Sequence, residues 1–227
     1  MKAYILSLII MISGCACKGA PGAIPVGTWD YDILINGVDA GEARTSVRAD
    51  KNRYVSVSYM TIEAGEVVNS YTQTLTETVD FKPVSLKIEN RIIHGSKTEN
   101  IDTVAVFNDN TVKLTAGGST RTITIDKPFV LDGAIYMSEL VRRKFRKGTE
   151  ISFSVYEPTV ETDEPISVKL LVLGEKQVEI NGEPRTLVHV VESIAGIKNI
   201  DIYVDDEGIT HKAVITMLNN SLELVLK

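Results

Sequence analysis

The residue best placed to do chemistry in this 227-residue chain is Cys15. It follows Ser13 and Gly14, and these small residues follow the apolar stretch Ala3–Ile12. An apolar stretch of this length behind one positive residue, Lys2, is typical of a signal peptide, and a membrane-spanning helix would need about 20 residues. A peptidase needs small residues before the bond that it cuts, and a thiol directly after that bond is a nucleophile that can be alkylated.

This pattern resembles a bacterial lipobox, which here would consist of Ile12, Ser13, Gly14 and Cys15. The resemblance implies that residues 1–14 are removed, that the thiol of Cys15 is joined to diacylglycerol, and that its new amino group is commonly acylated. Because Ala16 rather than Asp follows, the pattern is similar to that of lipoproteins released to the outer membrane. We therefore expect a lipid-anchored protein of the bacterial cell envelope, facing the periplasm. The alternatives are an ordinary secretory signal with an incidental cysteine and a buried hydrophobic helix.

Outside this segment, few side chains stand in a catalytic or metal-binding pattern. The second cysteine, Cys17, lies too close to Cys15 for an unstrained disulfide. The histidines lie far apart, without another His or a Cys three or four residues on: His94, His189 and His211. The apolar strand face around His189 favours a hydrogen-bonded structural histidine over a ligand. No nucleophile elbow, phosphate-binding loop or HExxH motif is present, so we expect a protein that is not an enzyme and has no metal and no cofactor.

The charged segments exclude one class of partner and leave two questions open. The chain has 24 basic and 30 acidic residues and a net charge of -6, which argues against nucleic acid as a partner. The basic run Arg142–Lys147 is the exception, and a solvated helix end accounts for it. The acidic segment Glu157–Pro165 is either solvated or a cation site, although its spacing matches no EF-hand loop.

Most of the chain after Trp29 alternates between apolar and polar residues, which is typical of β-strands. The dipeptides Asn36-Gly37 and Asn181-Gly182 predict two hairpin turns, because both residues of each pair tolerate positive φ. The segments Val168–Leu173 and Leu187–Val191 are apolar on both faces. We therefore expect them in the middle of the sheet, covered on both sides.

One stretch, Pro128–Gly148, is typical of a helix instead. Asp132 is suited to cap its start, and cations in its last turns suit the negative end of the helix dipole before Gly148 ends it. Its apolar stripe at helical spacing consists of Met137, Leu140, Val141 and Phe145. The prediction is a helix over Asp132–Lys147, the only obvious cover for a large sheet.

These elements predict a mainly β fold, a large curved antiparallel sheet or incomplete β-barrel with the helix packed on its concave face. About a dozen strands in one row must curl or split, and the apolar stripe of the helix must be buried. The expected organisation is a signal peptide at 1–14, the lipidated Cys15 with a flexible tether at 15–28, and a single β domain at 29–227. Two smaller β domains that meet near the helix are the alternative.

Three long segments carry a resemblance to a known family: LDGAIYMSELVRRKFRKGTEISFSVYEP, VKLLVLGEKQVEINGEPRTLVHV and IYVDDEGITHKAVITMLNNSLELVL. In this order they resemble a family of bacterial exported β proteins of unknown function, over roughly Tyr31 to Lys227. That family is similar in outline to the lipoprotein carriers LolA and LolB, in which a curved antiparallel sheet wraps around helices and leaves an apolar groove. The resemblance implies a fold and a location, and it carries no functional residue.

The expected function is an interaction rather than catalysis. An apolar ligand such as a lipid or lipopeptide would bind in a groove between sheet and helix, whose candidate lining is Phe107, Phe129, Ile135, Met137, Phe145, Phe153 and Leu170. The alternative is that these side chains fill the core and that the protein is a structural or docking component that binds an envelope protein.

Overall fold

The alternating segments of the chain form 14 antiparallel strands and the helical segment forms one short helix, described here in a computed structural model for residues 24–160, 163–194, 198–217 and 220–227. The elements are β1 (Gly27–Ile35), β2 (Val38–Asp50), β3 (Arg53–Ala64), β4 (Val67–Thr78), β5 (Pro83–His94), β6 (Lys97–Asn108), β7 (Thr111–Ala116), β8 (Ser119–Thr124), α1 (Ala134–Arg142), β9 (Glu150–Val155), β10 (Ile166–Ile180), β11 (Glu183–Ile194), β12 (Lys198–Val204), β13 (Thr210–Met217) and β14 (Asn220–Leu226). The predicted fold class is confirmed.

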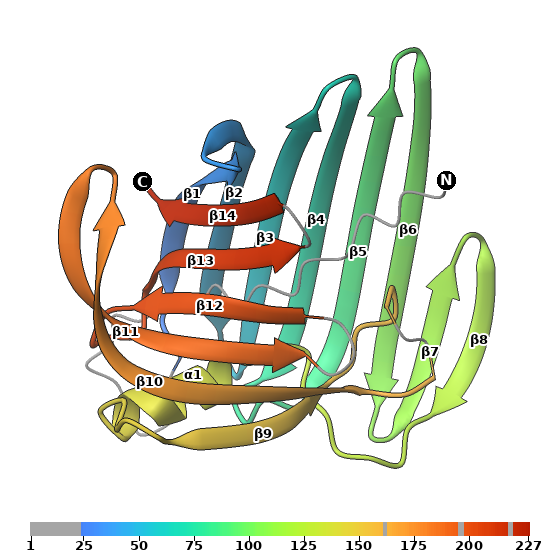
Figure 1. Ribbon diagram of the computed structural model, residues 1–227. Coiled ribbons are helices and arrows are strands. Elements are labelled where there is room, and N and C mark those ends of the chain that lie inside the picture. Colours follow the sequence, from blue (N-terminus) through green and yellow to red (C-terminus); the bar gives the residue numbers. More distant parts are fainter. Residues whose placement is uncertain (1–23, 161–162, 195–197, 218–219) are drawn as a thin grey trace.

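Within β1–β8 and within β9–β14 each strand pairs with its neighbour in sequence, and β1 also pairs with β14, so that all strands lie in one sheet that runs from β8 through β1 and β14 to β9. The first eight strands form one layer and the last six form a second layer in front of it, and the strands of the two layers cross (Figure 1). The sheet therefore curls around its own concave face, as expected for an incomplete barrel.

The concave face holds one large apolar core. Inward residues of β1 such as Tyr31 and Ile33 are fully buried, and they share this core with Leu170 of β10 and Ile202 of β12. Each large apolar side chain buried in this way stabilises the fold by about 1.5–3 kcal/mol. The alternation of apolar and polar residues along the strands thus accounts for the arrangement of the two layers.

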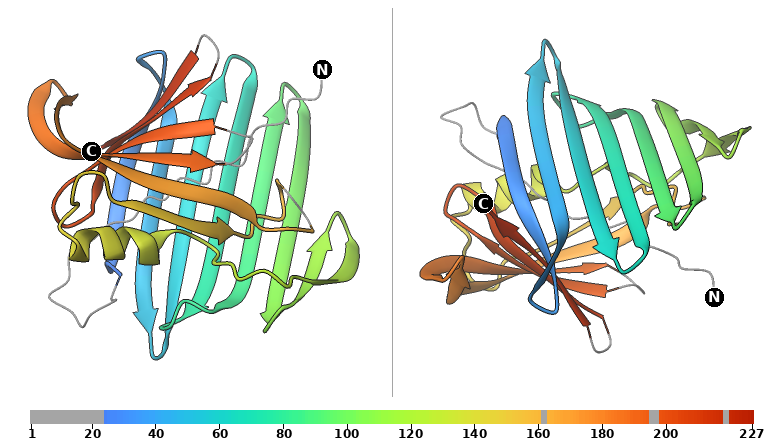
Figure 2. Two further views of the ribbon diagram at one scale, coloured as in Figure 1. Left: turned by 60° about the horizontal axis from the view of Figure 1, so that its bottom comes forward. Right: turned by 90° about the horizontal axis from the view of Figure 1, so that it is seen from above.

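The helix is shorter than the predicted range of Asp132–Lys147, since α1 ends at Arg142. Asp132 acts at its start by accepting a hydrogen bond from the backbone N–H of Ala134 at 2.9 Å, while the N-cap position itself is held by Gly133. The helix lies toward the bottom of the molecule in Figure 1, and the left view of Figure 2 shows it in front of strands of the first layer. Its buried face joins the main core through Met137 and Leu140. In the described part of the chain, no helix is long and apolar enough to span a membrane.

The β domain includes residues before Trp29, which lie ahead of the predicted boundary between tether and domain. The side chain of Ile24 is buried against Val47, Phe81 and Ala134, and β1 starts at Gly27. The last five residues of the predicted tether, 24–28, are therefore part of the domain. Residues 1–23, which include the predicted signal peptide and Cys15, lie outside the described residues.

The prediction that Val168–Leu173 and Leu187–Val191 lie in the middle of the sheet is wrong. They belong to β10 and β11, and β10 is the neighbour of the edge strand β9. Their second apolar face is covered only in part, since Leu173 of β10 is 40% exposed and Leu187 is the one residue of the two segments that joins a smaller cluster. The far part of the β10–β11 hairpin joins a smaller apolar cluster of buried Ile180, Leu187, Tyr203 and Val225.

The two Asn-Gly turns are confirmed. Asn36 and Gly37 have φ values of 54° and 78°, and Asn181 and Gly182 have values of 52° and 81°. Each pair connects two antiparallel strands, β1 to β2 and β10 to β11. Positive φ at both central residues matches the twist of the flanking strands, which explains why Asn-Gly is favoured here.

Gly41 allows a substitution test of the curled layer. Its φ is +146°, and a Cβ atom added there would lie 2.0 Å from the backbone oxygen of Thr61 on the neighbouring strand. We expect Gly41→Ala to lower the free energy of unfolding by about 3 kcal/mol or more, because backbone must move to relieve the clash.

Gly37→Ala is the matched control, because a Cβ atom at Gly37 would meet nothing within 4 Å. This variant should lower the free energy of unfolding by only about 1–2 kcal/mol, which is the strain of positive φ at a residue with a Cβ atom. Urea unfolding of both variants measures the difference, and equal losses would contradict the close packing of β2 on β3.

Candidate functional site

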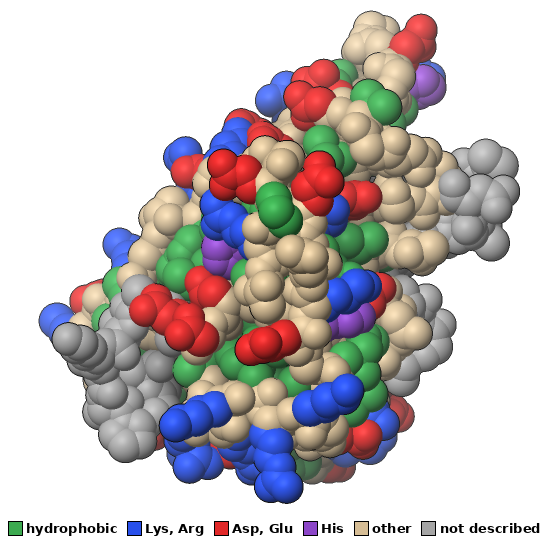
Figure 3. Space-filling model, turned by 60° about the vertical axis from the view of Figure 1, so that its left-hand side comes forward, with side chains coloured by type: hydrophobic (Ala, Val, Ile, Leu, Met, Phe, Trp, Pro, Cys, Tyr) green, Lys and Arg blue, Asp and Glu red, His purple; other side chains and the backbone are tan. Residues whose placement is uncertain are grey.

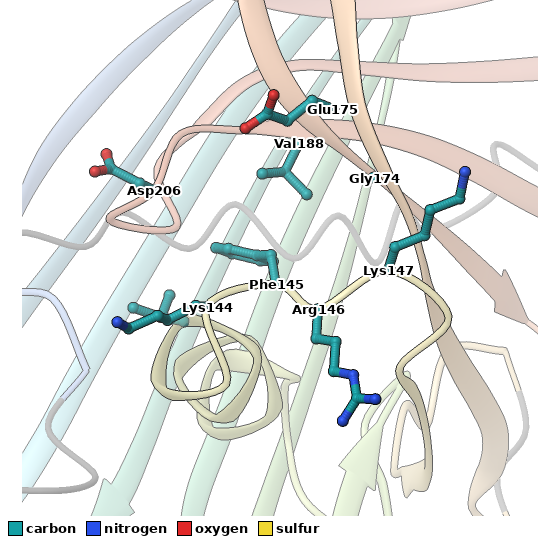
Figure 4. Close-up of a pocket in the computed structure, with 9 residues that line it drawn as sticks. Lys144, Phe145, Arg146, Lys147, Gly174, Glu175, Val188 and Asp206 are labelled. Carbon is teal, nitrogen blue, oxygen red and sulfur yellow. The ribbon is translucent and has the colours of Figure 1, made fainter.

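A groove opens at the end of α1, where the segment that follows the helix meets β10, β11 and the turn between β12 and β13. Its volume is about 680 Å³. It is lined by Val141, Lys144, Phe145, Arg146, Lys147, Gly174, Glu175, Val188 and Asp206. Figure 4 shows the ring of Phe145 at the centre of the groove, with Val188 across from it. The groove therefore has an apolar floor within a charged rim.

The early end of the helix places Phe145 in this groove. Lys144 and Phe145 have positive φ values of 51° and 44°, which no continuing α-helix allows. The backbone N–H of Phe145 donates to the carbonyl oxygen of Leu140 at 2.9 Å, which closes the last turn. The reversal buries the Phe145 ring and leaves Lys144 and Arg146 exposed.

A bulge in β10 shapes the facing wall. The pairing with β11 shifts register between Val172 and Gly174, and Gly174 has a φ of +100°. A Cβ atom at Gly174 would lie 3.2 Å from Cδ of Lys147, so the aliphatic stem of this lysine packs against the glycine. Backbone hydrogen bonds hold the two segments together, from Gly148 N to Val172 O at 2.8 Å and from Val172 N to Thr149 O at 3.0 Å.

The rim of the groove carries charges of both signs on opposite sides. Lys144, Arg146 and Lys147 come from the segment after the helix, whereas Glu175 comes from β10 and Asp206 from the turn between β12 and β13 (Figure 4). Such an arrangement of an apolar floor and ionic rims suits an amphipathic ligand better than a purely apolar one.

On the helix itself, one carboxylate binds two arginines. Glu139 accepts hydrogen bonds from Arg142 at 2.6 and 2.7 Å and from Arg143 at 2.6 Å. These hydrogen bonds, first from Arg142 and then from Arg143, lower the pKa of Glu139 to about 2. Arg142 and Arg143 are thus paired with Glu139. The next cations along the chain, Lys144 and Arg146, lie in the segment after the helix and not on the helix itself.

The predicted groove residues all join one apolar core, but they do not line one groove. Phe107 and Phe129 form an aromatic cluster with Tyr156, with ring centroids 5.4–5.9 Å apart. Phe153 stacks on Tyr136 at 4.1 Å. The remaining candidates lie inside the main core or against it: Ile135, Met137, Phe145 and Leu170.

Of the seven candidates, Phe145 lines the groove at the helix end. Phe153 lines a separate hollow of about 700 Å³ on β9–β12, whose walls are rich in serine. Burial of Met137 and Leu170 in the core fits the alternative that these two side chains only fill space. Sequence reasoning missed Val188, Gly174 and Asp206, because their approach to the helix end depends on the bulge in β10 and carries no local signal.

The histidines make pairwise contacts with carboxylates. Nε2 of His189 lies 2.6 Å from Oδ1 of Asp201, and the His189 ring stacks on Tyr203 at 4.8 Å. This fits the expected structural histidine. His211 lies 3.0 Å from Asp205, whose other oxygen accepts hydrogen bonds from the turn between β12 and β13. Within the described ranges, no group of three His, Cys, Asp or Glu residues is placed to hold a metal ion.

The described acids of the Glu157–Pro165 segment have protein partners. Glu157 is buried and accepts hydrogen bonds from Thr159 and from Gln73, while burial raises its pKa. Further along, Asp163 pairs with Arg121 at 3.2 Å and Glu164 with Lys127 at 2.8 Å. Through these contacts the segment after β9 is linked to β4, to β8 and to Lys127, which follows β8.

Fold and groove together define the class of protein, a barrel-like antiparallel β protein with a short helix at one end of its sheet. The chain belongs to the DUF3108 family, described as a protein of unknown function, which matches residues 30–227. The expected family resemblance over the β domain is thereby confirmed at this level.

One solved structure supports the fold. The chain is similar to the crystal structure of a β-barrel-like protein of domain of unknown function DUF1849 from Brucella abortus, with a TM-score of 0.61 and 14% identity over 88% of this chain and 94% of that chain. A DUF1089 family protein from Pseudomonas aeruginosa gives a TM-score of 0.36 and 12% identity over 82% and 89% of the two chains. No curated protein matches the chain.

A pair of carboxyl groups beneath the helix start predicts a pH dependence of stability. Glu77 is buried, lies near Asp132 and accepts a hydrogen bond from Leu131 N at 3.2 Å. Burial first, and the charge of Asp132 second, raise the pKa of Glu77 to about 9, and burial also raises the pKa of Asp132. Because the folded state keeps a proton that the unfolded state releases, the contribution of Glu77 to stability is fully present below the unfolded pKa near 4.5 and is lost as the pH rises to about 9.

We expect Glu77→Gln to remove part of this loss, because the amide stays neutral and can still accept the hydrogen bond from Leu131. The variant should match the parent near pH 5 and exceed its free energy of unfolding by roughly 1–3 kcal/mol near pH 8–9. Urea titrations across this range measure it, with Glu99→Gln at an exposed site as the control. Parallel pH profiles of Glu77→Gln and the parent would contradict a protonated Glu77.

Proposed function

We propose that this chain is a non-enzymatic lipoprotein of the bacterial cell envelope that binds an amphipathic ligand, such as a lipid or lipopeptide, in the groove at the end of α1. Two observations support the proposal. The run of Ile12 to Cys15 supplies a site for lipidation, and the groove supplies an apolar floor of suitable size. Sites for small ligands commonly measure about 300–1,000 Å³.

The groove is the observation that carries the binding function. The floor consists of Val141, Phe145 and Val188. Its mouth is open to solvent and its rims carry both signs of charge, so a ligand with an acyl chain and a charged headgroup matches both parts. The rest of the interior is filled by buried side chains. We therefore place the ligand at the helix end and not in the middle of the core.

The location follows from the proposed lipid anchor. Two or three acyl chains at Cys15 would hold the protein stably on a membrane, where one chain would be marginal, since each buried CH₂ contributes about 0.8 kcal/mol. Ala16 after the cysteine favours the outer membrane, with the domain facing the periplasm. The curved sheet around a helix is also similar in outline to the LolA and LolB carriers, which supports transport or holding of a lipid-bearing molecule.

The second candidate function is a structural or docking component of the envelope. Complete burial of Met137 and Leu170 supports it, because a packed core needs no ligand. The two candidates differ in one respect that can be measured. A carrier retains its ligand through purification, whereas a docking protein leaves the groove empty.

The anchor is tested by Cys15→Ala. This substitution removes the only thiol at the predicted cleavage site, so incorporation of labelled palmitate should fall to background and the unprocessed precursor should accumulate. Cys17→Ala is the matched control and should leave both labelling and processing intact. Persistent labelling of Cys15→Ala would rule out the lipobox.

The ligand is tested on the chain Lys18–Lys227, purified from a bacterial host without detergent and extracted for lipid mass spectrometry. We expect about one bound amphiphile per protein. Val188→Glu should abolish it, because a carboxylate in the apolar floor repels an acyl chain at a cost of several kcal/mol.

Val104→Glu introduces the same change at a half-buried valine of β6 outside the groove, and it should retain the lipid. Circular dichroism of both variants verifies that the fold is intact. Parent protein that is free of lipid would favour the docking role.

A further inference from the structure

We infer that the helix end of the domain docks on anionic phospholipid headgroups of the membrane that anchors the protein, through Lys144, Arg146 and Lys147. This inference rests on the proposed lipid anchor and adds a partner and an orientation to it. The chain as a whole has a net charge of -6. A compact group of cations at one end therefore has the opposite sign to the net charge of the chain.

These three cations are available for an external partner. Their side chains are exposed, and within the described ranges no carboxylate lies at ion-pair distance from them. The neighbouring Arg142 and Arg143 share the single carboxylate of Glu139, which leaves the segment with a surplus of positive charge. Figure 3 shows Lys and Arg side chains gathered at the lower end of the molecule.

The acids nearest to this group lie on its inner side. Glu175 and Asp206 form the sheet wall of the groove, and Figure 4 shows them across the groove from Arg146. The Arg146 side chain points away from them. In Figure 4 Lys144 points to one side of the groove and Lys147 extends along β10 past Gly174, and all three cations are exposed, so an anionic surface can reach them.

The path of the chain brings the anchor to the same end. Ile24, the first described residue, is buried against Ala134, the first residue of α1. The helix has nine residues and therefore rises only about 14 Å. Eight residues lie between Cys15 and Ile24, and the nine steps from one to the other span at most roughly 30 Å when extended and about 17 Å as a coil. A lipidated Cys15 therefore holds the helix end within reach of the bilayer.

The opposite end of the first layer carries the other sign. A hollow of about 330 Å³ there is lined by Asp32, Asp39, Glu42 and Glu63, with Lys227 as its one cation. An anionic membrane repels this end and attracts the helix end, so electrostatics and the tether favour the same orientation. In that orientation the groove at Phe145 opens beside the headgroups, which is the position needed to exchange an amphiphile with the membrane.

The test uses the lipidated protein, reconstituted in vesicles of phosphatidylcholine alone or with about 30% phosphatidylglycerol, and measures amide hydrogen exchange. If each cation near the surface contributes about five-fold, three of them favour the docked orientation about a hundred-fold. Exchange of residues 142–148 should slow strongly on the anionic vesicles only, while the β5–β6 turn at 94–97 stays unchanged. About 1 M salt should abolish the protection, because it shortens the Debye length to about 3 Å.

The triple variant Lys144→Glu, Arg146→Glu, Lys147→Glu should lose this protection. A matched triple variant on exposed sites of β5, β6 and β7 changes the net charge equally and should keep it: Arg91→Glu, Lys97→Glu and Lys113→Glu. Loss in both variants would mean that net charge alone acts, and it would overturn docking by the helix end.

Two further outcomes distinguish failure of the docking from failure of the proposed lipid anchor on which the docking rests. Protein that floats with the vesicles but shows equal exchange on both lipid mixtures overturns the docking and leaves the anchor intact. Protein that carries no acyl chain and does not float overturns the anchor and the docking together. Protection that requires an added acidic protein and no anionic lipid also overturns the inference.

Discussion

The pairing of the first strand with the last is the constraint on which the rest of the fold depends. Without the contact of β1 with β14, the chain would form two separate meanders with two more open edges. Asn36 reinforces this contact from the turn. Its side chain donates to Oδ1 of Asn220 and accepts from the backbone N–H of Ser221, both at 2.9 Å. Asn36 therefore belongs to the β1–β2 turn and also connects this turn to the start of β14 by hydrogen bonds.

The barrel stays incomplete where β8 and β9, the two edge strands, face each other. Part of this gap is closed by Val130, which pairs in parallel with β9 through hydrogen bonds to Ser154 and Tyr156. The aromatic cluster of Phe107, Phe129 and Tyr156 fills the space behind it. The surface ion pairs across the gap contribute about 0–1 kcal/mol each, so apolar contact and not charge closes this side.

The sequence predicted those features that are encoded locally. Period-two alternation and the Asn-Gly pairs identified strands and hairpins, because side-chain direction and positive φ depend on few residues. The length of the helix was wrong, since the apolar spacing of Phe145 continues a helical stripe although its backbone leaves the helix. The position of β10 was wrong because apolar residues on both faces indicate burial without saying what covers them. Here the second face of this part of β10 stays partly open, since Leu173 is 40% exposed.

The candidate groove was beyond sequence reasoning for the same reason, as it arises where three departures from regular structure meet. Lys144 and Phe145 adopt positive φ, and Gly174 adopts a φ of +100° at a bulge. Non-glycine residues in this region of backbone space carry strain of about 1–3 kcal/mol each, and such strain persists only where the surrounding structure enforces it. A continued helix would relieve the strain, but it would also carry Phe145 out of the groove and the lysines away from the lower end. The strained turn therefore fixes the apolar floor and the exposed cations together, so the proposed ligand binding and the proposed membrane docking depend on one short segment.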